Sequence, residues 1–398
     1  MAVERRIAFK DFENLVDLFR TKGKHDNPPV ENIDVNLCTH LILIGSCHLD
    51  HKSTIVLPRT DEINALWKMK KKNPKLKILF SLTPKNTYMS KLVDSEYLLD
   101  SFVSNVTTFL LKHKIDGFDI DWEFPVWSKD AKKTDKIGFT YMLEKLRYAF
   151  NESSRKPLLT AAVAAPYDIV KKAYDIKVLS RNLDYIQIMN YDFHVYSKSF
   201  PFTGFNAPLF REASFAVPLL ARMNSKILFG IPTYGRGYTL LIPALHSLYA
   251  PTIGVSKLGA SQTYAQVCNL VKDKDYTYAF NKRARSPYIY GAKDQWFSLE
   301  DQSSMYSKAR YARENNLGGI MIFDLHSDDY KGICGQGRYP LIRAAKMAVS
   351  YEKRLSYRNR SRKDWTSIKQ FLNKPQTSDQ LERHRIQEKS RSLSNTLK

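Results

Sequence analysis

Residues 114–125 read KIDGFDIDWEFP, an otherwise apolar stretch in which acidic residues stand at every second position near its end. Side chains two residues apart on a β-strand point to the same face of the sheet. Asp119, Asp121 and Glu123 are therefore predicted to point together toward an interior. Asp116 is an odd number of residues from these three acids, so its side chain points to the other face. We expect it to hydrogen-bond to backbone groups where the strand begins.

Asp119, Asp121 and Glu123, called the acidic row below, are costly to place side by side. Neighbouring carboxylates repel one another and lose hydration, a cost that Val or Ile at the same positions would not incur. Such a group shares protons, so the pKa of at least one member rises, which suits a general acid. The alternative is a structural network in which buried Arg or Lys neutralise the acids, but nearby strands offer few inward-facing basic residues.

Short apolar runs alternate with longer helix-like stretches through residues 6–350, the pattern of a parallel sheet wrapped by helices. The predicted strands are residues 6–12, 39–45, 77–82, 115–121, 158–164, 184–190, 227–232 and 319–323. Together with helical segments such as 98–112 and 139–150, they favour a closed (β/α)8 TIM barrel over an open doubly wound sheet. Active sites of such barrels lie at the carboxyl ends of the strands, which places Glu123 at the mouth.

The interval 238–317, between the seventh and eighth predicted strands, is too long for one crossover helix. Its helix-like piece 264–272 and its aromatic-rich pieces 276–280 and 286–290 predict a small inserted α+β subdomain. Residues 1–350 would then form the barrel with its insertion. Residues 351–398 lose apolar periodicity and are predicted to be a disordered basic tail.

The formal net charge of +22 suggests an anionic partner. However, residues 352–398 alone hold thirteen Lys and Arg against five Asp and Glu, so the excess fits a solvated surface and tail better than a nucleic-acid site. No apolar run is long enough to span a membrane. No secretory signal is visible after Met1, and the four cysteines are too scattered for a disulfide scaffold or a zinc site.

The acidic segment closely resembles the D-x-x-D-x-D-x-E signature of glycoside hydrolase family 18, which comprises chitinases and chitinase-like lectins. Asp116, Asp119, Asp121 and Glu123 match all four of its acids. Further similar segments follow in the family's order, at residues 36–41, 189–192, 230–235, 318–321 and 328–340. The resemblance therefore covers nearly all of residues 6–350.

This resemblance implies hydrolysis of β-1,4-linked N-acetylglucosamine polymers by substrate-assisted retention. Glu123 would protonate the glycosidic oxygen and later act as base for water. Asp121 would hold the acetamide N–H of the sugar, Asp119 would share a proton with Asp121, and Tyr191 would position the acetamide. No metal or organic cofactor is implied.

The resemblance also assigns a substrate-binding surface, to which we add two aromatic residues: Phe124, Met189, Asn190, Asp192, Phe323, Tyr234 and Trp122. The expected partner is chitin or a chito-oligosaccharide, bound by a monomer. Cys268 and Cys334 resemble the family's disulfide pair, which indicates an extracellular protein although no signal peptide is visible. The interval 238–317 matches the family's small α+β domain.

Several aromatic positions of the family are altered. Residues 81–85 read SLTPK where the family has S-x-G-G-W, and Phe323 stands where it usually has Trp. With the first strand at residues 6–12, Asp11 and Leu15 replace a Tyr and a Trp, and Lys10 falls near the expected partner of Cys38. Replacement stacking surface could come from Trp122, Tyr234, Tyr238, Tyr288 and Trp296. The alternative hypothesis is thus a lectin that binds chito-oligosaccharides without turnover.

Overall fold

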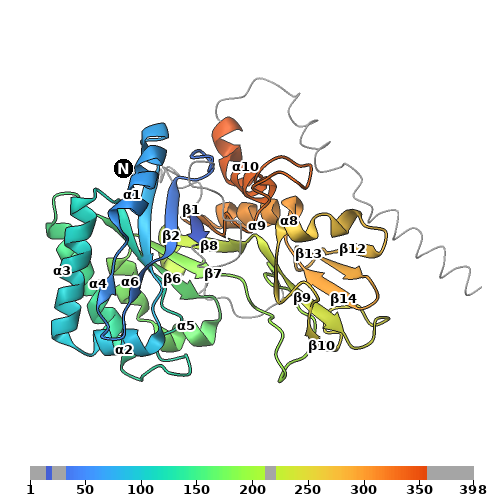
Figure 1. The fold of residues 1–398 in the computed structure, drawn as a ribbon, viewed down its shortest axis with the longest axis horizontal. Helices are drawn as coiled ribbons and strands as arrows, with labels where there is room; N and C mark the ends of the chain where they lie inside the picture. Colours follow the sequence, from blue (N-terminus) through green and yellow to red (C-terminus); the bar gives the residue numbers. More distant parts are fainter. Residues whose placement is uncertain (1–14, 20–32, 211–220, 356–398) are drawn as a thin grey trace, which may run out of the picture.

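A closed ring of parallel strands forms the larger lobe of the molecule (Figure 1). The computed structural model describes residues 15–19, 33–210 and 221–355. The strands pair side by side around the ring, and the last pairs with the first, in the order β1 (Leu15–Phe19), β2 (His40–Leu49), β4 (Lys77–Leu82), β5 (Gly117–Ile120), β6 (Leu158–Ala164), β7 (Tyr185–Met189), β8 (Ile227–Pro232) and β15 (Gly319–Phe323). The predicted (β/α)8 TIM barrel is confirmed.

Most predicted strands lie where the structure has them, and four of them have the predicted bounds: β4, β6, β8 and β15. The central strand is shorter than predicted, because β5 ends at Ile120 and not at Asp121. The predicted first strand, 6–12, lies outside the described residues. The described β1 pairs Leu15 with His40 and Phe19 with Ile44. Leu15 thus begins the described strand, and the correspondences for Lys10 and Asp11 fall outside the described residues.

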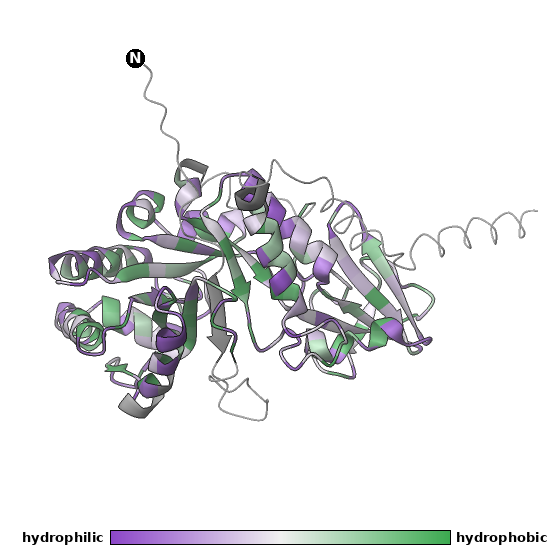
Figure 2. Ribbon diagram, turned by 90° about the horizontal axis from the view of Figure 1, so that it is seen from above, coloured by the Kyte–Doolittle hydropathy of each residue, from purple (hydrophilic) through white to green (hydrophobic). Residues whose placement is uncertain are grey.

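Helices surround the ring and pack against the strands or against one another: α1 (Thr60–Lys72), α2 (Asn86–Val93), α3 (Glu96–Lys112), α4 (Asp135–Glu152), α5 (Tyr167–Ala173), α6 (Ile176–Asn182), α9 (Gln302–Glu314) and α10 (Pro340–Leu355). In α3, Leu99, Phe102, Val106 and Leu110 recur every three or four residues and are buried. Ser95 begins this helix, because its side chain accepts a hydrogen bond from the Leu98 N–H. Figure 2 shows apolar residues concentrated on the strands, whereas the helices alternate apolar and polar residues.

A second, antiparallel sheet forms the smaller lobe. Its elements are β9 (Tyr234–Leu240), β10 (Thr252–Val255), β11 (Ser261–Thr263), β12 (Tyr276–Asn281), β13 (Ser286–Gly291) and β14 (Gln295–Ser298), with α8 (Tyr264–Val267) and the short 3-10 helix η3 (Leu270–Lys272) beside them. The sheet starts at Tyr234, so it includes residues before the predicted interval 238–317. That interval also contains α9, which packs against α10, β8 and β15 of the barrel.

Aromatic side chains form the core of the small lobe. Tyr238 is 1% exposed and Trp296 is fully buried, and their rings meet edge to face at 5.6 Å. Tyr288 is partly buried and stacks on Trp296 at 5.3 Å. Tyr238 and Trp296 therefore cannot serve as sugar platforms, which corrects that hypothesis. They stabilise the lobe instead, because fully buried aromatic rings contribute large apolar contact areas.

Covalent and ionic contacts join the segments around α8, α9 and α10. The expected disulfide between Cys268 and Cys334 is present and links the end of α8 to the loop before α10. Glu300 and Lys308 form an ion pair whose side chains are 1% and 2% exposed. Cys38 and Cys47 are buried free thiols, and burial raises the pKa of each to about 12. Among the described helices, none is long and apolar enough to cross a membrane.

Candidate active site

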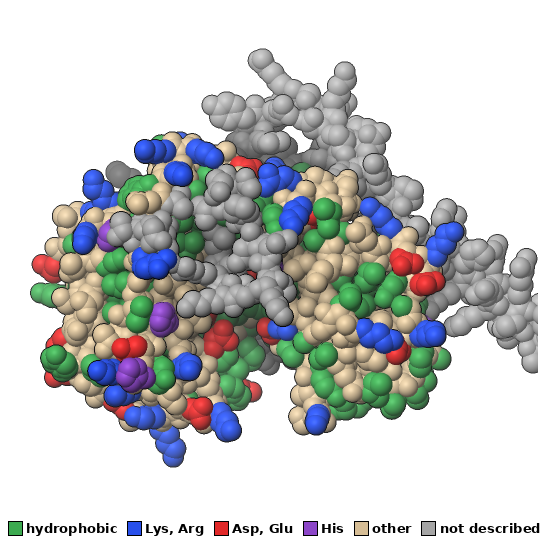
Figure 3. Space-filling model, viewed as in Figure 1, with side chains coloured by type: hydrophobic (Ala, Val, Ile, Leu, Met, Phe, Trp, Pro, Cys, Tyr) green, Lys and Arg blue, Asp and Glu red, His purple; other side chains and the backbone are tan. Residues whose placement is uncertain are grey.

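The acidic row lies at the carboxyl end of β5, at the barrel mouth. Asp119 is on the strand and fully buried, Asp121 follows it and is 7% exposed, and Glu123 reaches solvent. Beyond the last residue of β5 the chain still runs alongside β4, because the Asp121 N–H donates to the Leu82 carbonyl at 2.9 Å. On the face drawn in Figure 3, the two lobes are separated by a notch at the lower edge.

Asp119 is held by uncharged donors from three neighbouring strands. Its carboxylate accepts from Ser81 Oγ on β4 at 2.8 Å, from Thr160 Oγ1 on β6 at 2.5 Å and from Gln187 Nε2 on β7 at 2.6 Å. Burial raises the pKa of Asp119, and these three hydrogen bonds oppose that rise. Within the described part of the chain, no Lys or Arg forms an ion pair with the acidic row. The structural alternative, a network with buried cations, is therefore not supported.

The remaining two acids hold their protons at higher pH than isolated carboxyls do. Burial raises the pKa of Asp121 well above its usual value, and the negative charges of Glu123 and Asp119 raise it further. Asp121 Oδ1 is buried and has no hydrogen-bond partner among the described residues. Burial also raises the pKa of Glu123, with a second contribution from the charge of Asp192. The row thus keeps a proton available at the mouth, as a general acid requires.

The backbone next to Glu123 is fixed by two side chains that the sequence analysis missed. Asn86 Nδ2, at the start of α2, donates to the Glu123 carbonyl at 2.9 Å, and Ser128 Oγ donates to the same oxygen at 2.8 Å. Asn86 Oδ1 accepts from Trp122 Nε1 at 2.6 Å. Trp122 is 1% exposed and packs edge to face on Phe139 of α4. It therefore cannot be a sugar platform, because it faces the helices and not the mouth.

Aromatic rings lie at the ends of β7, β8 and β15. Tyr191 and Phe323 stack at 5.6 Å between ring centres, and Tyr234 meets both rings edge to face at 6.1 Å. Tyr191 Oη approaches Met321 Sδ at 3.9 Å. Met189 packs in the same cluster. The structure thus brings four of the sequence-predicted residues, Met189, Tyr191, Tyr234 and Phe323, into one group at the mouth.

The other predicted residues are placed as follows. Asn190 is buried, its Oδ1 has no partner within the described chain, and its Nδ2 donates to the Ile188 carbonyl. Asp192 has a positive φ of 59° and accepts two hydrogen bonds from Arg236, from Nε at 2.8 Å and from Nη2 at 2.5 Å. Phe124 is partly buried against the main core.

Asp116 is structural, as expected. It accepts the Ile78 N–H at 2.9 Å and pairs with Lys70 and Lys77 at the opposite end of β5.

Sequence reasoning missed the donors to Asp119 and the cation opposite Asp192. Ser81, Thr160 and Gln187 are polar residues inside otherwise apolar strands, and that was a usable signal. The pairing register places Ser81, Asp119 and Thr160 side by side across β4, β5 and β6. Arg236 sits in β9, and only the fold brings it to Asp192.

Comparison with known proteins gives a family and an architecture. The family model described as glycosyl hydrolases family 18 matches residues 18–328. Mouse chitotriosidase-1 is 32% identical over 371 residues, which cover 83% of this chain and 76% of that protein. The human protein YKL-39, described as a pseudo-chitinase with retained chitooligosaccharide binding, is 27% identical with a TM-score of 0.76, covering 85% of this chain and 100% of that one.

A solved catalytic domain gives a similar match. Catalytic domain 2 of the Group II chitinase from Ostrinia furnacalis is 27% identical with a TM-score of 0.78, covering 86% of this chain and 97% of that domain. The similar proteins thus include chitinases and a protein that binds the oligosaccharide and is described as a pseudo-chitinase.

Proposed function

Because the chain belongs to glycosyl hydrolases family 18, we propose that it hydrolyses β-1,4-linked N-acetylglucosamine chains by a substrate-assisted retaining mechanism. One observation carries the proposal: three acids meet at the mouth without a neutralising cation from the described residues, and the pKa of each is raised. A lectin site would not need this costly arrangement.

In this proposal Glu123, the outermost acid, carries out the first chemical step. Its protonated carboxyl donates the proton to the glycosidic oxygen, and the bond from that oxygen to the anomeric carbon breaks. The acetamido carbonyl oxygen of the same sugar attacks the anomeric carbon, which forms a positively charged oxazolinium ring. The raised pKa of Glu123 keeps this proton available at a higher pH than a free Glu side chain would.

Asp121 stabilises the positive ring. Its buried Oδ1, which has no hydrogen-bond partner among the described residues, accepts the acetamide N–H, and a proton shared with Asp119 sets how much negative charge Asp121 carries. Tyr191 positions the acetamide, while Phe323 lies beneath the sugar. Glu123, now ionised, then takes a proton from water as the water oxygen attacks the anomeric carbon. The bond from that carbon to the acetamido oxygen breaks, which restores the acetamide and gives the product with net retention.

Met189, Asn190, Asp192 and Tyr234 line the same subsite in this proposal. Phe124 lies next to Glu123 and contributes an apolar edge. No metal or organic cofactor takes part. The Cys268–Cys334 disulfide supports an extracellular location, since such bonds persist in oxidising compartments.

Altered aromatic positions favour a second candidate, a lectin that binds chito-oligosaccharides without turnover. Phe323 offers less stacking area than Trp and no N–H, and Lys85 stands where the resemblance places a Trp. These changes weaken sugar binding rather than proton transfer.

A fluorogenic chito-oligosaccharide assay separates the two functions. We expect turnover by the wild type and a loss of at least about a hundredfold in Glu123→Gln, since general acid catalysis contributes roughly 10²–10⁴-fold. Calorimetry should show that the variant still binds the oligosaccharide. Binding without turnover by the wild type would refute hydrolysis and establish the lectin.

A further inference from the structure

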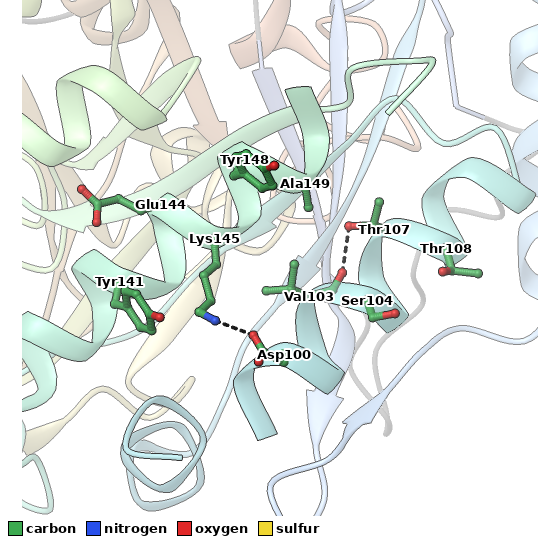
Figure 4. Close-up of a pocket in the computed structure, with 10 residues that line it drawn as sticks. All are labelled: Asp100, Val103, Ser104, Thr107, Thr108, Tyr141, Glu144, Lys145, Tyr148 and Ala149. Carbon is green, nitrogen blue, oxygen red and sulfur yellow. Dashed lines mark hydrogen bonds and ion pairs between the residues drawn. The ribbon is translucent and has the colours of Figure 1, made fainter. Parts of the chain in front are cut away.

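A groove runs along the outer wall of the barrel between α3 and α4, away from the acidic row (Figure 4). Its volume is about 590 Å³. α3 contributes Asp100, Ser104 and Thr108 to the lining, and α4 contributes Tyr141, Lys145 and Tyr148. Both helices belong to the main core cluster through their buried faces, so the lining side chains stand on a rigid support.

The two tyrosines are exposed aromatic surfaces, of which Tyr141 carries the Lys145 ammonium over one part of its ring. They are seven residues apart on α4, so they lie on one face of the helix, separated by two turns or about 10.5 Å. Tyr141 is 42% exposed and Tyr148 is 71% exposed. Exposed aromatic rings at this spacing match two sugar rings about one disaccharide apart, and sugars bind proteins through such faces.

The polar lining between these rings selects a neutral ligand. Lys145 pairs with Asp100 at 2.5 Å and lies 4.8 Å from the centre of the Tyr141 ring, so its charge is already compensated. Glu144 leaves the groove with an excess of one negative charge, on a chain whose net charge is +22. The hydroxyls of Ser104 and Thr108 can donate and accept hydrogen bonds. An anionic ligand is therefore disfavoured, and a hydroxyl-rich one is favoured.

We propose that the groove between α3 and α4 is a second carbohydrate-binding site, which holds a neutral β-linked N-acetylglucosamine chain outside the barrel mouth. The choice of this sugar rests on the proposed function. Residues 124–134 connect Glu123 to the start of α4, so Tyr141 is nearer the mouth than Tyr148. A polymer bound here would therefore run along the outer wall with its Tyr141 end toward the mouth.

The test compares two variants that replace exposed tyrosines by alanine, one inside the groove and one outside it. Tyr141→Ala/Tyr148→Ala removes both rings of the groove. Tyr97→Ala removes a ring that is 81% exposed on α3 but does not line the groove. Each protein is titrated onto insoluble chitin beads, and its turnover of a soluble fluorogenic chito-oligosaccharide is measured in parallel.

We expect the double variant to lose roughly tenfold or more in affinity for chitin beads, the effect of two aromatic contacts of usual strength. Its soluble turnover should match the wild type, as should both properties of Tyr97→Ala. An unchanged affinity for chitin in the folded double variant would overturn the second site. If the double variant does not fold, Ser104→Arg, whose longer side chain fills the groove, takes its place. A loss of affinity for chitin beads would then support the second site, and an unchanged affinity would overturn it. If no protein, wild type included, turns over the soluble substrate, the proposed hydrolysis is refuted. The second site is still tested in that case, because binding to the chitin beads does not depend on turnover.

Discussion

Removing one donor from Asp119 tests whether the acidic row titrates as the structure requires. Thr160→Val keeps the shape of the side chain but deletes the hydroxyl that donates to Asp119 Oδ1 at 2.5 Å. Thr160→Ser is the matched control, because it keeps the hydroxyl and loses only a methyl group. Asp119 is fully buried, so water cannot replace the lost donor at no cost.

The size of the effect depends on the charge of Asp119. A hydrogen bond to a charged group contributes about 1.5–3 kcal/mol, and one between neutral groups about 0.5–1.5 kcal/mol. At 1.36 kcal/mol per pKa unit, the difference of about 1–1.5 kcal/mol raises the pKa of Asp119 by about one unit in the variant.

The sign of the pH dependence follows from the direction of the wild-type shift. The pKa of Asp119 is already raised by burial, so its contribution to stability is full below the pKa of the unfolded chain and falls as pH rises through the folded pKa. Thr160→Val enlarges this fall. Its deficit relative to wild type is therefore smaller at acid pH and reaches about 1.5–3 kcal/mol once Asp119 is ionised.

Urea unfolding of wild type, Thr160→Val and Thr160→Ser, repeated across the pH range, measures this deficit. We expect the deficit of Thr160→Val to grow with pH, and that of Thr160→Ser to stay small and constant. A deficit for Thr160→Val that does not change with pH would refute the view that Asp119 is a buried carboxylate held by neutral donors.

Three further predictions concern the surroundings of the row and the small lobe. Asp192→Asn removes a negative charge that adds to the effect of burial in raising the pKa of Glu123, so the alkaline limb of kcat/KM should move to lower pH, as a pH profile would show; an unmoved limb would contradict the coupling. Asn86→Ala loses one of two donors to the Glu123 carbonyl, so kcat should fall about tenfold with little change in KM. A rise in KM with kcat unchanged would argue against a positioning role. Lys308→Met leaves the buried Glu300 carboxylate without its cation, which should destabilise the fold by about 3–5 kcal/mol at alkaline pH and less at acid pH. Burial raises the pKa of Glu300 to about 7 even with Lys308 opposing the rise, so the variant raises it further, and protonation below that higher pKa removes the unpaired charge. Equal losses at both pH values in urea unfolding would contradict this.

The barrel itself was predictable because its strands are short apolar runs between polar turns. Residues 77–82 and 158–164 fall on β4 and β6 without adjustment. The first strand was not predictable in this way, since residues 6–12 and 15–19 carry similar apolar patterns. The described strand is recognised by its pairing, in which Leu15–Phe19 aligns with His40–Ile44 of β2.

The acidic row was predictable because side chains alternate between the two faces of a strand. The same alternation would have excluded Trp122 as a sugar-binding residue. Asp119, Asp121 and Glu123 share one parity, whereas Trp122 has the other and packs on Phe139 behind the strand. Its aromatic character suggested a sugar platform, but the direction of its side chain decides its role. Parity is therefore a better guide to this site than residue type.

The layer beneath the row depends on the order of strands, which no single segment contains. Asp119 is flanked by Ser81 on one side and Thr160 on the other because β4 and β6 pair with β5 in that register, and Gln187 reaches across from β7. Polar residues in these strands would each be a defect in an apolar core. Together they give a buried acid its hydrogen bonds without adding a cation. A cation here would offset the negative charge of Asp119 and so lower the pKa of Asp121. We infer that the neutral character of these donors, and not only their number, helps to keep the pKa of Asp121 raised, since the charge of Asp119 adds to the effect of burial on Asp121.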